Sequence, residues 1–222
     1  MKDNIMFYTG RNKIGNMVGY VRLGTQCFRA YVASVRDANT DAQKLVRAKC
    51  AEMTRIYRLY RAGARVGLAY AAKQGKRTAA NEFFKLNYPR IVGATPGSLT
   101  FDWSVAQVSR GYTPGVVYSS NIDVISTPNT VTISVTDQQL TAYGADADDK
   151  VHVLVMCPDA EGAVLSVAVG RAFLQTNNKI EVPVPAAWSG LDVHVYGFTI
   201  SAASDTYGQG SNTDYIGHAT LN

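Results

Sequence analysis

Between Asn39 and Lys73, the alternation of apolar and polar positions predicts one long helix. Residues of high helix propensity fill this stretch, and Asn39 or Thr40 offers a side-chain oxygen to its first free amides. At about 100° per residue, one side of the helix is apolar and carries Leu45, Met53, Ile56, Tyr60, Ala64 and Ala71. We expect this side to pack against the rest of the protein.

The other side of the predicted helix is cationic. It collects Lys44, Arg47, Arg55, Arg58, Arg61, Arg65 and Lys73. Asp41 and Glu52 are the acidic residues of the stretch, so most of these cations have no acid four residues away to neutralise them. The pattern therefore predicts a surface that binds an acidic protein or phosphate groups.

Residues 10–36 are rich in β-branched and aromatic side chains on both sides of Gly24, which predicts a β-hairpin that turns there. Four cations of this region are candidate contacts, namely Arg11, Lys13, Arg22 and Arg29. Gly10 and Gly15 have the spacing of a phosphate-binding loop, but Asn16 and Met17 stand where that loop needs Lys and Ser or Thr. A nucleotide site is thus disfavoured.

A second, shorter helix is predicted over residues 79–88, with Thr78 as its cap and Pro89 at its end. Phe83 and Phe84 fit a core-facing stripe better than a platform for stacking bases. From residue 91 onward the sequence consists of short strand-like runs separated by turns. We predict strands at Leu99–Val105, Ile122–Ile125, Thr130–Thr136, Val151–Met156, Val164–Ala172, Lys179–Val184, Asp192–Ser201 and Tyr215–Thr220.

The predicted fold class is α+β, with a hairpin, a long basic helix and a short second helix followed by an antiparallel β-sandwich of immunoglobulin-like or fibronectin-like type. Charge supports a division after Arg90. Residues 1–90 hold 18 Lys and Arg against 5 Asp and Glu, whereas residues 91–222 hold 4 against 12. We therefore predict a basic docking region over residues 1–90 and an acidic sandwich over residues 91–222.

Candidate catalytic and metal-binding residues do not form a usable constellation in the sequence. Cys27, Cys50 and Cys157 are far apart and have no nearby histidines, which disfavours both a disulfide framework and a zinc site. His152 and His194 lie in strand-like runs without a third ligand. The sequence contains no Gly-x-Ser-x-Gly motif. We expect no catalytic residue, no metal, no cofactor and no small-molecule substrate.

The acidic segment with Asp146, Asp148 and Asp149 lacks the glycine and the closing glutamate of a calcium loop, so we interpret it as a solvated turn. The first fifteen residues lack the apolar run of a signal peptide, and no later run approaches about eighteen apolar residues. We expect an unsecreted protein without a membrane span.

Loose motifs over most of the chain resemble an uncharacterised family of gut bacteria, their prophages and their phages. The first group of matching residues is Gly10, Gly15, Val18, Gly19, Tyr20, Arg29, Asn39, Thr40, Gln43 and Arg47. Further matches are Val108–Gly111, Val184–Gly190 and the run DVHVYGFTISA from Asp192. The resemblance implies a basic N-terminal region joined to an immunoglobulin-like domain, and a role in the virion of a phage, with crAss-like phages as the setting.

Three functions compete on this basis. The leading expectation is a non-enzymatic structural or assembly protein made in the bacterial cytoplasm. It would dock through its basic region on portal or capsid proteins at the phage head or portal vertex, and bind other copies of itself. The alternative is a nucleic-acid-binding accessory protein whose helical cations contact phosphates. An enzyme ranks third, because no catalytic constellation is visible.

Overall fold

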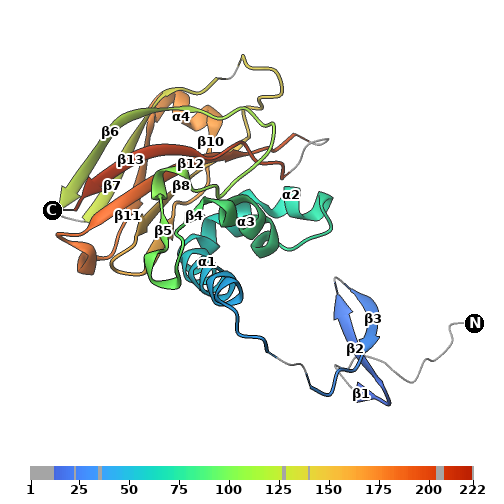
Figure 1. Cartoon of the computed structure of the whole chain (residues 1–222). Coiled ribbons are helices and arrows are strands. Elements are labelled where there is room, and N and C mark those ends of the chain that lie inside the picture. The colour runs from blue at the N-terminus through green and yellow to red at the C-terminus, as the bar shows by residue number, and fades with distance from the viewer. Residues whose placement is uncertain are drawn as a thin grey trace, which may run out of the picture. The chain divides into compact units, whose positions relative to one another are not determined.

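A computed structural model describes residues 13–22, 24–34, 37–126, 129–139, 141–203 and 208–221 (Figure 1). Two compact units divide the chain, Met1–Gln43 and Lys44–Asn222. This division lies at the start of the long helix, whereas the charge pattern of the sequence changes after Arg90. Helices and several antiparallel sheets are both present, so the predicted α+β class is confirmed.

The first unit contains a small antiparallel sheet. Its strands are β1 (Lys13–Ile14), β2 (Met17–Arg22) and β3 (Thr25–Ala30), in that order across the sheet. Gly24 has a φ of 80°, a conformation that glycine adopts without strain, as a turn at this position requires. Leu23 of the same turn lies outside the described residues. The predicted hairpin is formed by β2 and β3, and β1 adds a third strand.

Helix α1 (Asp41–Gly67) begins with a capping box. The N–H of Gln43 donates to Thr40 Oγ1 at 3.3 Å, and the N–H of Thr40 donates to Gln43 Oε1 at 3.2 Å. Reciprocal bonds of this kind satisfy two backbone donors at the helix start and identify Thr40, rather than Asn39, as the cap.

The prediction of one continuous helix to Lys73 was wrong, because α1 ends at Gly67 and α2 (Ala69–Gln74) follows after Leu68. A loop packs directly against the end of α1. A Cβ atom at Gly67 would lie 2.5 Å from the carbonyl oxygen of Val108, and Ser109 Oγ donates to the carbonyl oxygen of Gly67 at 3.1 Å. Glycine has a low helix propensity, and its lack of a Cβ atom lets the loop approach the backbone closely. The end of α1 is therefore determined by tertiary packing.

The predicted second helix is confirmed as α3 (Ala79–Asn87), where the N–H of Asn81 donates to Thr78 Oγ1 at 3.2 Å. The predicted strand over Leu99–Val105 is shorter than expected. Only β5 (Thr100–Phe101) forms there and pairs with β4 (Ile91–Val92). Asp102 then caps the 3-10 helix η3 (Trp103–Val105) by accepting from the N–H of Ser104 at 2.9 Å. The other 3-10 helices are η1 (Tyr88–Arg90), η2 (Pro96–Ser98) and η4 (Ala186–Trp188).

Two larger antiparallel sheets form the centre of the second unit. The five-stranded sheet has the order β10-β8-β12-β13, with β9 also paired to β8, and the three-stranded sheet has the order β11-β7-β6. Their strands are β6 (Val117–Ser126), β7 (Asn129–Asp137), β8 (Lys150–Cys157), β9 (Gly162–Leu165), β10 (Val169–Gly170), β11 (Lys179–Pro183), β12 (Asp192–Ile200) and β13 (Asp214–Thr220).

The predicted single strand over Val164–Ala172 was wrong, because β9, β10 and helix α4 (Arg171–Asn177) share this stretch. Ser166 separates β9 from β10. Its hydroxyl accepts from the N–H of Val153 at 2.9 Å, and its own N–H donates to the carbonyl oxygen of Val153 at 2.7 Å. A side chain thus substitutes for one bond of the strand ladder.

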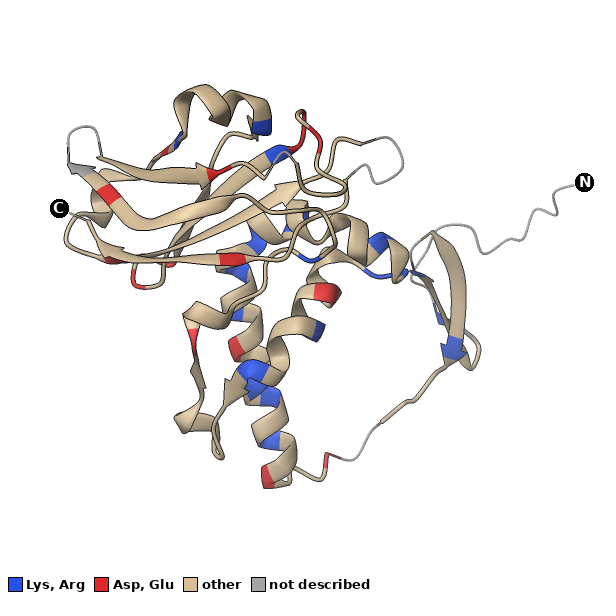
Figure 2. Ribbon diagram, turned by 90° about the horizontal axis from the view of Figure 1, so that it is seen from above, with Lys and Arg blue, Asp and Glu red and all other residues tan. Residues whose placement is uncertain are grey.

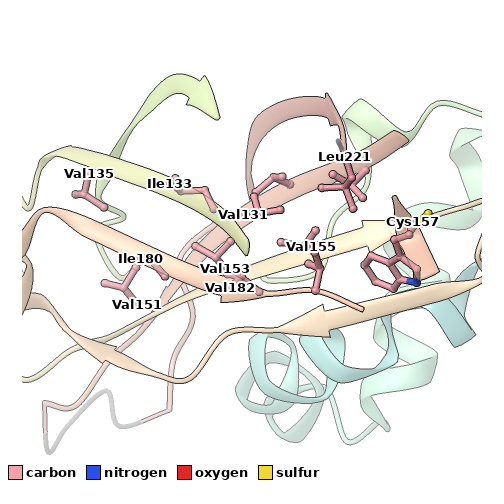
Figure 3. Packing of buried hydrophobic residues seen from close by; sticks show 14 of the residues in the cluster. Val131, Ile133, Val135, Val151, Val153, Val155, Cys157, Ile180, Val182 and Leu221 are labelled. Carbon is pink, nitrogen blue, oxygen red and sulfur yellow. The ribbon is translucent and has the colours of Figure 1, made fainter. Parts of the chain in front are cut away.

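Hydrophobic residues form two clusters, one on each face of the five-stranded sheet. The first lies between the two sheets and contains Val131, Ile133, Val153, Val155, Val182 and Val195 among its members (Figure 3). The second lies between the five-stranded sheet and the helices, where Met53, Ile56, Tyr60 and Phe83 meet Leu154, Met156, Tyr196 and Phe198. The second unit therefore has three layers, and residues on both sides of the charge division at Arg90 share one core.

A buried ion pair joins several loops of the second unit. Arg171 Nη2 lies 3.0 Å from Asp149 Oδ2, and both side chains are fully buried. The guanidinium also donates to the carbonyl oxygens of Pro114 at 2.6 Å, Gly115 at 3.2 Å and Gln138 at 2.6 Å. The interpretation that Asp149 lies in a solvated turn was therefore wrong. Its carboxylate is buried, where it neutralises the charge of Arg171.

His152 and His194 lie on the helix side of the five-stranded sheet, opposite the valines with which they alternate. His152 pairs in register with Phe198 and stacks on its ring at a centroid distance of 5.3 Å. His194 Nδ1 lies 2.9 Å from the hydroxyl oxygen of Tyr215. Burial lowers the pKa of both imidazoles, and neighbouring His218 lowers the pKa of His194 further.

Limited proteolysis can test the position of the domain boundary. We expect cleavage between residues 31 and 43 and a resistant fragment that extends from about residue 44 to the C-terminus, because α1 shares a core with the sheets. Mass spectrometry of the fragments would locate the cut. Release of a stable fragment that begins near residue 91 would instead support the boundary predicted from charge.

The buried His152 and the half-buried His194 predict acid sensitivity. In the unfolded state, the pKa of each histidine returns from its lowered value toward 6.5. As the pH falls, the unfolded state therefore binds more protons than the folded state. Their contribution to the free energy of unfolding is complete above about pH 7 and is lost as the pH falls through 6.5 toward the folded-state pKa. His152→Phe keeps a ring against Phe198 and removes one titrating group. In urea denaturation this variant should lose less stability than the wild type between about pH 7.5 and about pH 5.5, and an equal loss would contradict the assignment.

Candidate docking surface

Three exposed arginines of α1 form what we call the cationic face, namely Arg58, Arg61 and Arg65. Spacings of three and four residues place them on one side of the helix. With a rise of 1.5 Å per residue, Arg58 and Arg65 are separated by about 10 Å along the axis. Within the described part of the chain, none of the three forms an ion pair. Their charges are therefore available to a partner.

Packing on the opposite side of α1 fixes the direction of the cationic face. Ile56, Tyr60 and Ala64 are fully buried against the five-stranded sheet. The hydroxyl oxygens of Tyr60 and Tyr196 lie 2.6 Å apart, and the Tyr196 hydroxyl donates to the carbonyl oxygen of Trp103 at 2.8 Å. Burial raises the pKa of Tyr60, which keeps the hydroxyl neutral. Because these contacts hold α1 in one rotation, Arg58, Arg61 and Arg65 are exposed on the side opposite the core.

Arg55 differs from the other arginines, because it is neutralised within the chain. Its Nη2 lies 2.7 Å from Glu52 Oε1, and its Nη1 lies 3.9 Å from Glu161 Oε1. The hydrogen bond to Glu52 raises the pKa of Arg55. Arg55 was predicted among the cations of the binding surface, and its contact with a partner stays a prediction, but its charge is already paired within the chain. Glu52, three residues earlier in the sequence, was the signal for this pair.

The remaining predicted cations of the helices are distributed along α1 and α2. Lys44 and Arg47 are exposed in the first turns of α1, and Lys73 is exposed on α2. The first buried residue of α1 is Met53, so the turns that precede it contribute little to the core. A contact of these turns with a partner stays a prediction.

The structure places three of the predicted hairpin cations on one face of the small sheet, namely Lys13, Arg22 and Arg29. Lys13 and Arg29 both pair in register with Val18, so they lie on the same face of the sheet as Val18. Arg22 lies four residues after Val18 in β2, and an even spacing along a strand places it on that face too. Lys13 Nζ also lies 3.8 Å from the ring centroid of Tyr31. Arg11 lies outside the described residues. The opposite face carries exposed apolar side chains, among them Met17, Val21 and Phe28.

Among the residues that the structure describes, no group of three or more His, Cys, Asp or Glu could hold a metal ion. No described helix is long and apolar enough to span a membrane. Cys27, Cys50 and Cys157 are unpaired. The exposed guanidinium side chains of the cationic face can bind anionic groups.

Two acidic residues were not singled out in the sequence. Asp123 on β6 and Glu181 on β11 both pair in register with Thr132 on β7, so the three side chains form one row across the three-stranded sheet. Alternation along each strand indicates that these positions face one side of the sheet, but only the register brings them together. Residues 58 positions apart in the chain give no local signal of such a row.

Alanine substitutions should separate the structural arginine from the exposed ones. Arg55→Ala removes a partly exposed ion pair and should lower the free energy of unfolding by about 0.5–1 kcal/mol. Arg58→Ala should change it by less than about 0.5 kcal/mol, because Arg58 is exposed and has no ion pair with a described residue. Chemical denaturation measures both values. Equal destabilisation by the two substitutions would mean that Arg58 has a structural contact.

Comparison with known proteins gives one family match. Residues 8–217 match a family of unknown function, DUF6266. Neither the curated proteins nor the solved structures contain a significant match to this chain. The family match extends from the hairpin through the helices and both large sheets to β13. Because it covers nearly the whole sequence, the chain belongs to the DUF6266 family.

Proposed function

We propose that the protein is a non-enzymatic structural or assembly subunit that docks on an acidic surface through the cationic face of α1. The observation that carries this proposal is the outward direction of Arg58, Arg61 and Arg65, which have no ion pair with any described residue. Three like charges within about 10 Å repel one another. An acidic partner removes this repulsion.

Arginine suits such a contact chemically. Its planar guanidinium donates two parallel hydrogen bonds to one carboxylate, which adds geometric specificity to the charge attraction. The helix also presents these groups in a fixed arrangement, because the Tyr60 hydroxyl and the apolar side of α1 are held by the sheet. A rigid surface loses less conformational entropy on binding than a flexible one.

The setting proposed for this subunit is a phage particle. Its support is the resemblance of the sequence motifs to proteins of gut bacteria, prophages and phages. Portal or capsid proteins at the head or portal vertex are the proposed partners, and assembly takes place in the bacterial cytoplasm. We also propose that the two large sheets form an immunoglobulin-like sandwich, supported by the core that they share. Superposition of experimental coordinates on immunoglobulin domains would test that assignment.

Nucleic acid is the alternative partner, favoured by the regular spacing of arginines along one helix face. Contacts with phosphates would give an affinity whose logarithm falls against the logarithm of salt concentration by about 0.9 per phosphate neutralised. Loss of three such contacts would reduce the slope by about three phosphate equivalents. A protein partner predicts no such DNA affinity.

The variant Arg58→Glu, Arg61→Glu, Arg65→Glu tests the docking face. Its fold should be intact, because these side chains are exposed, whereas its incorporation into particles should be abolished. Co-sedimentation with assembled heads measures incorporation, and an electrophoretic shift with duplex DNA at two salt concentrations measures the alternative.

A control is Lys150→Glu with Arg110→Glu, which reverses two exposed charges that lie outside α1. This control should be incorporated like the wild type. Undiminished incorporation of the triple variant would exclude the cationic face as the docking surface, whatever its effect on DNA binding.

A further inference from the structure

The row formed by Asp123, Thr132 and Glu181, which we call the acidic row, lies on the outer side of the three-stranded sheet. Val131 and Ile133, the neighbours of Thr132 on β7, point into the core between the two large sheets. Successive residues of a strand point to opposite faces, so Thr132 and its register partners point away from that core. Asp123 and Glu181 are exposed, whereas Thr132 between them is buried.

Neither carboxylate of the acidic row has an ion pair or a side-chain hydrogen bond to another described residue. Neighbouring strands are about 4.8 Å apart, so Asp123 and Glu181 stand about 10 Å apart across β7. Lys179 lies on the same side of β11 and next to Ser134, and its charge offsets part of the acidity. With Asp123 and Glu181, the described face remains acidic.

The acidic row and the cationic face lie on the two outer layers of the second unit, on opposite sides of the five-stranded sheet. The three-stranded sheet packs on one face of the five-stranded sheet, and α1 packs on the other. The distribution of charge follows this order, because residues 44–90 hold 12 Lys and Arg against 2 Asp and Glu. Figure 2 shows the cations gathered on the helices and the acidic residues mostly on the strands and loops. One copy thus presents a cationic layer and an acidic layer.

We propose that the cationic face of one copy docks on the acidic row of a second copy, in a head-to-tail arrangement. The separation of Arg58 and Arg65, about 10 Å, matches that of Asp123 and Glu181, so two ion pairs can form at once. The proposal rests on the docking face proposed above and names a second copy as its acidic partner. After two copies dock in this way, one cationic face and one acidic row remain unoccupied. Further copies can therefore bind at both ends, which produces a chain or a closed ring.

Purified full-length protein tests this arrangement without any other component. Sedimentation velocity at about 50 mM salt should show association that depends on protein concentration, and about 500 mM salt should weaken it at least tenfold because screening shortens the range of the charges. Arg58→Gln with Arg65→Gln should be monomeric, and so should Asp123→Asn with Glu181→Gln. Mixed together, these two variants retain one intact cationic face and one intact acidic row. The mixture should therefore form 1:1 pairs that grow no further.

Two control variants have the same charge changes elsewhere. Arg110→Gln with Lys150→Gln, and Asp148→Asn with Asp159→Asn, should associate like the wild type. A wild type that is monomeric at about 50 mM salt up to millimolar concentration, or a mixture that forms no pairs, would overturn the inference. If the wild type is monomeric while the triple glutamate variant fails to enter particles, the docking face keeps its proposed function and its partner is a different protein.

Discussion

Burial of both faces of β8 is the constraint on which the second unit depends. Val151, Val153, Val155 and Cys157 face the three-stranded sheet, while Leu154 and Met156 face the helices, and all six are fully buried. At about 25 cal/mol per Å² of apolar surface, exposure of either face would cost several kcal/mol. The helices therefore belong to the core of the sheet, and the docking face of α1 exists only as the outer side of that layer.

Local patterns in the sequence predicted the parts of the fold that depend on short-range interactions. The start of α1 at Asn39 or Thr40, the buried side of α1 and the cap of α3 at Thr78 follow from side chains close together in the sequence. The strands β7, β8, β11, β12 and β13 follow from short strand-like runs bounded by turn residues. These interactions involve residues that are close together in the chain, so a single sequence is enough to find them.

Other features needed information that lies far away in the chain. The end of α1 depends on Ser109, which binds the carbonyl oxygen of Gly67. Neutralisation of Arg55 was visible in part, since Glu52 is a helical neighbour, but Glu161 comes from the turn before β9. The acidic row required the register of three strands. Leu154 and Met156 alternate with valines in β8 and give this strand a second apolar face, which the helices cover.

The Arg171 and Asp149 pair has a consequence for the order in which the second unit assembles. Asp149 also accepts from the N–H groups of Asp146 at 3.0 Å and Ala202 at 2.9 Å, so the pair joins segments that extend from Pro114 to Ala202. Burial of either charge before its partner arrives is costly. These segments are therefore expected to close in one cooperative step late in folding, and to exchange their amide hydrogens together rather than loop by loop.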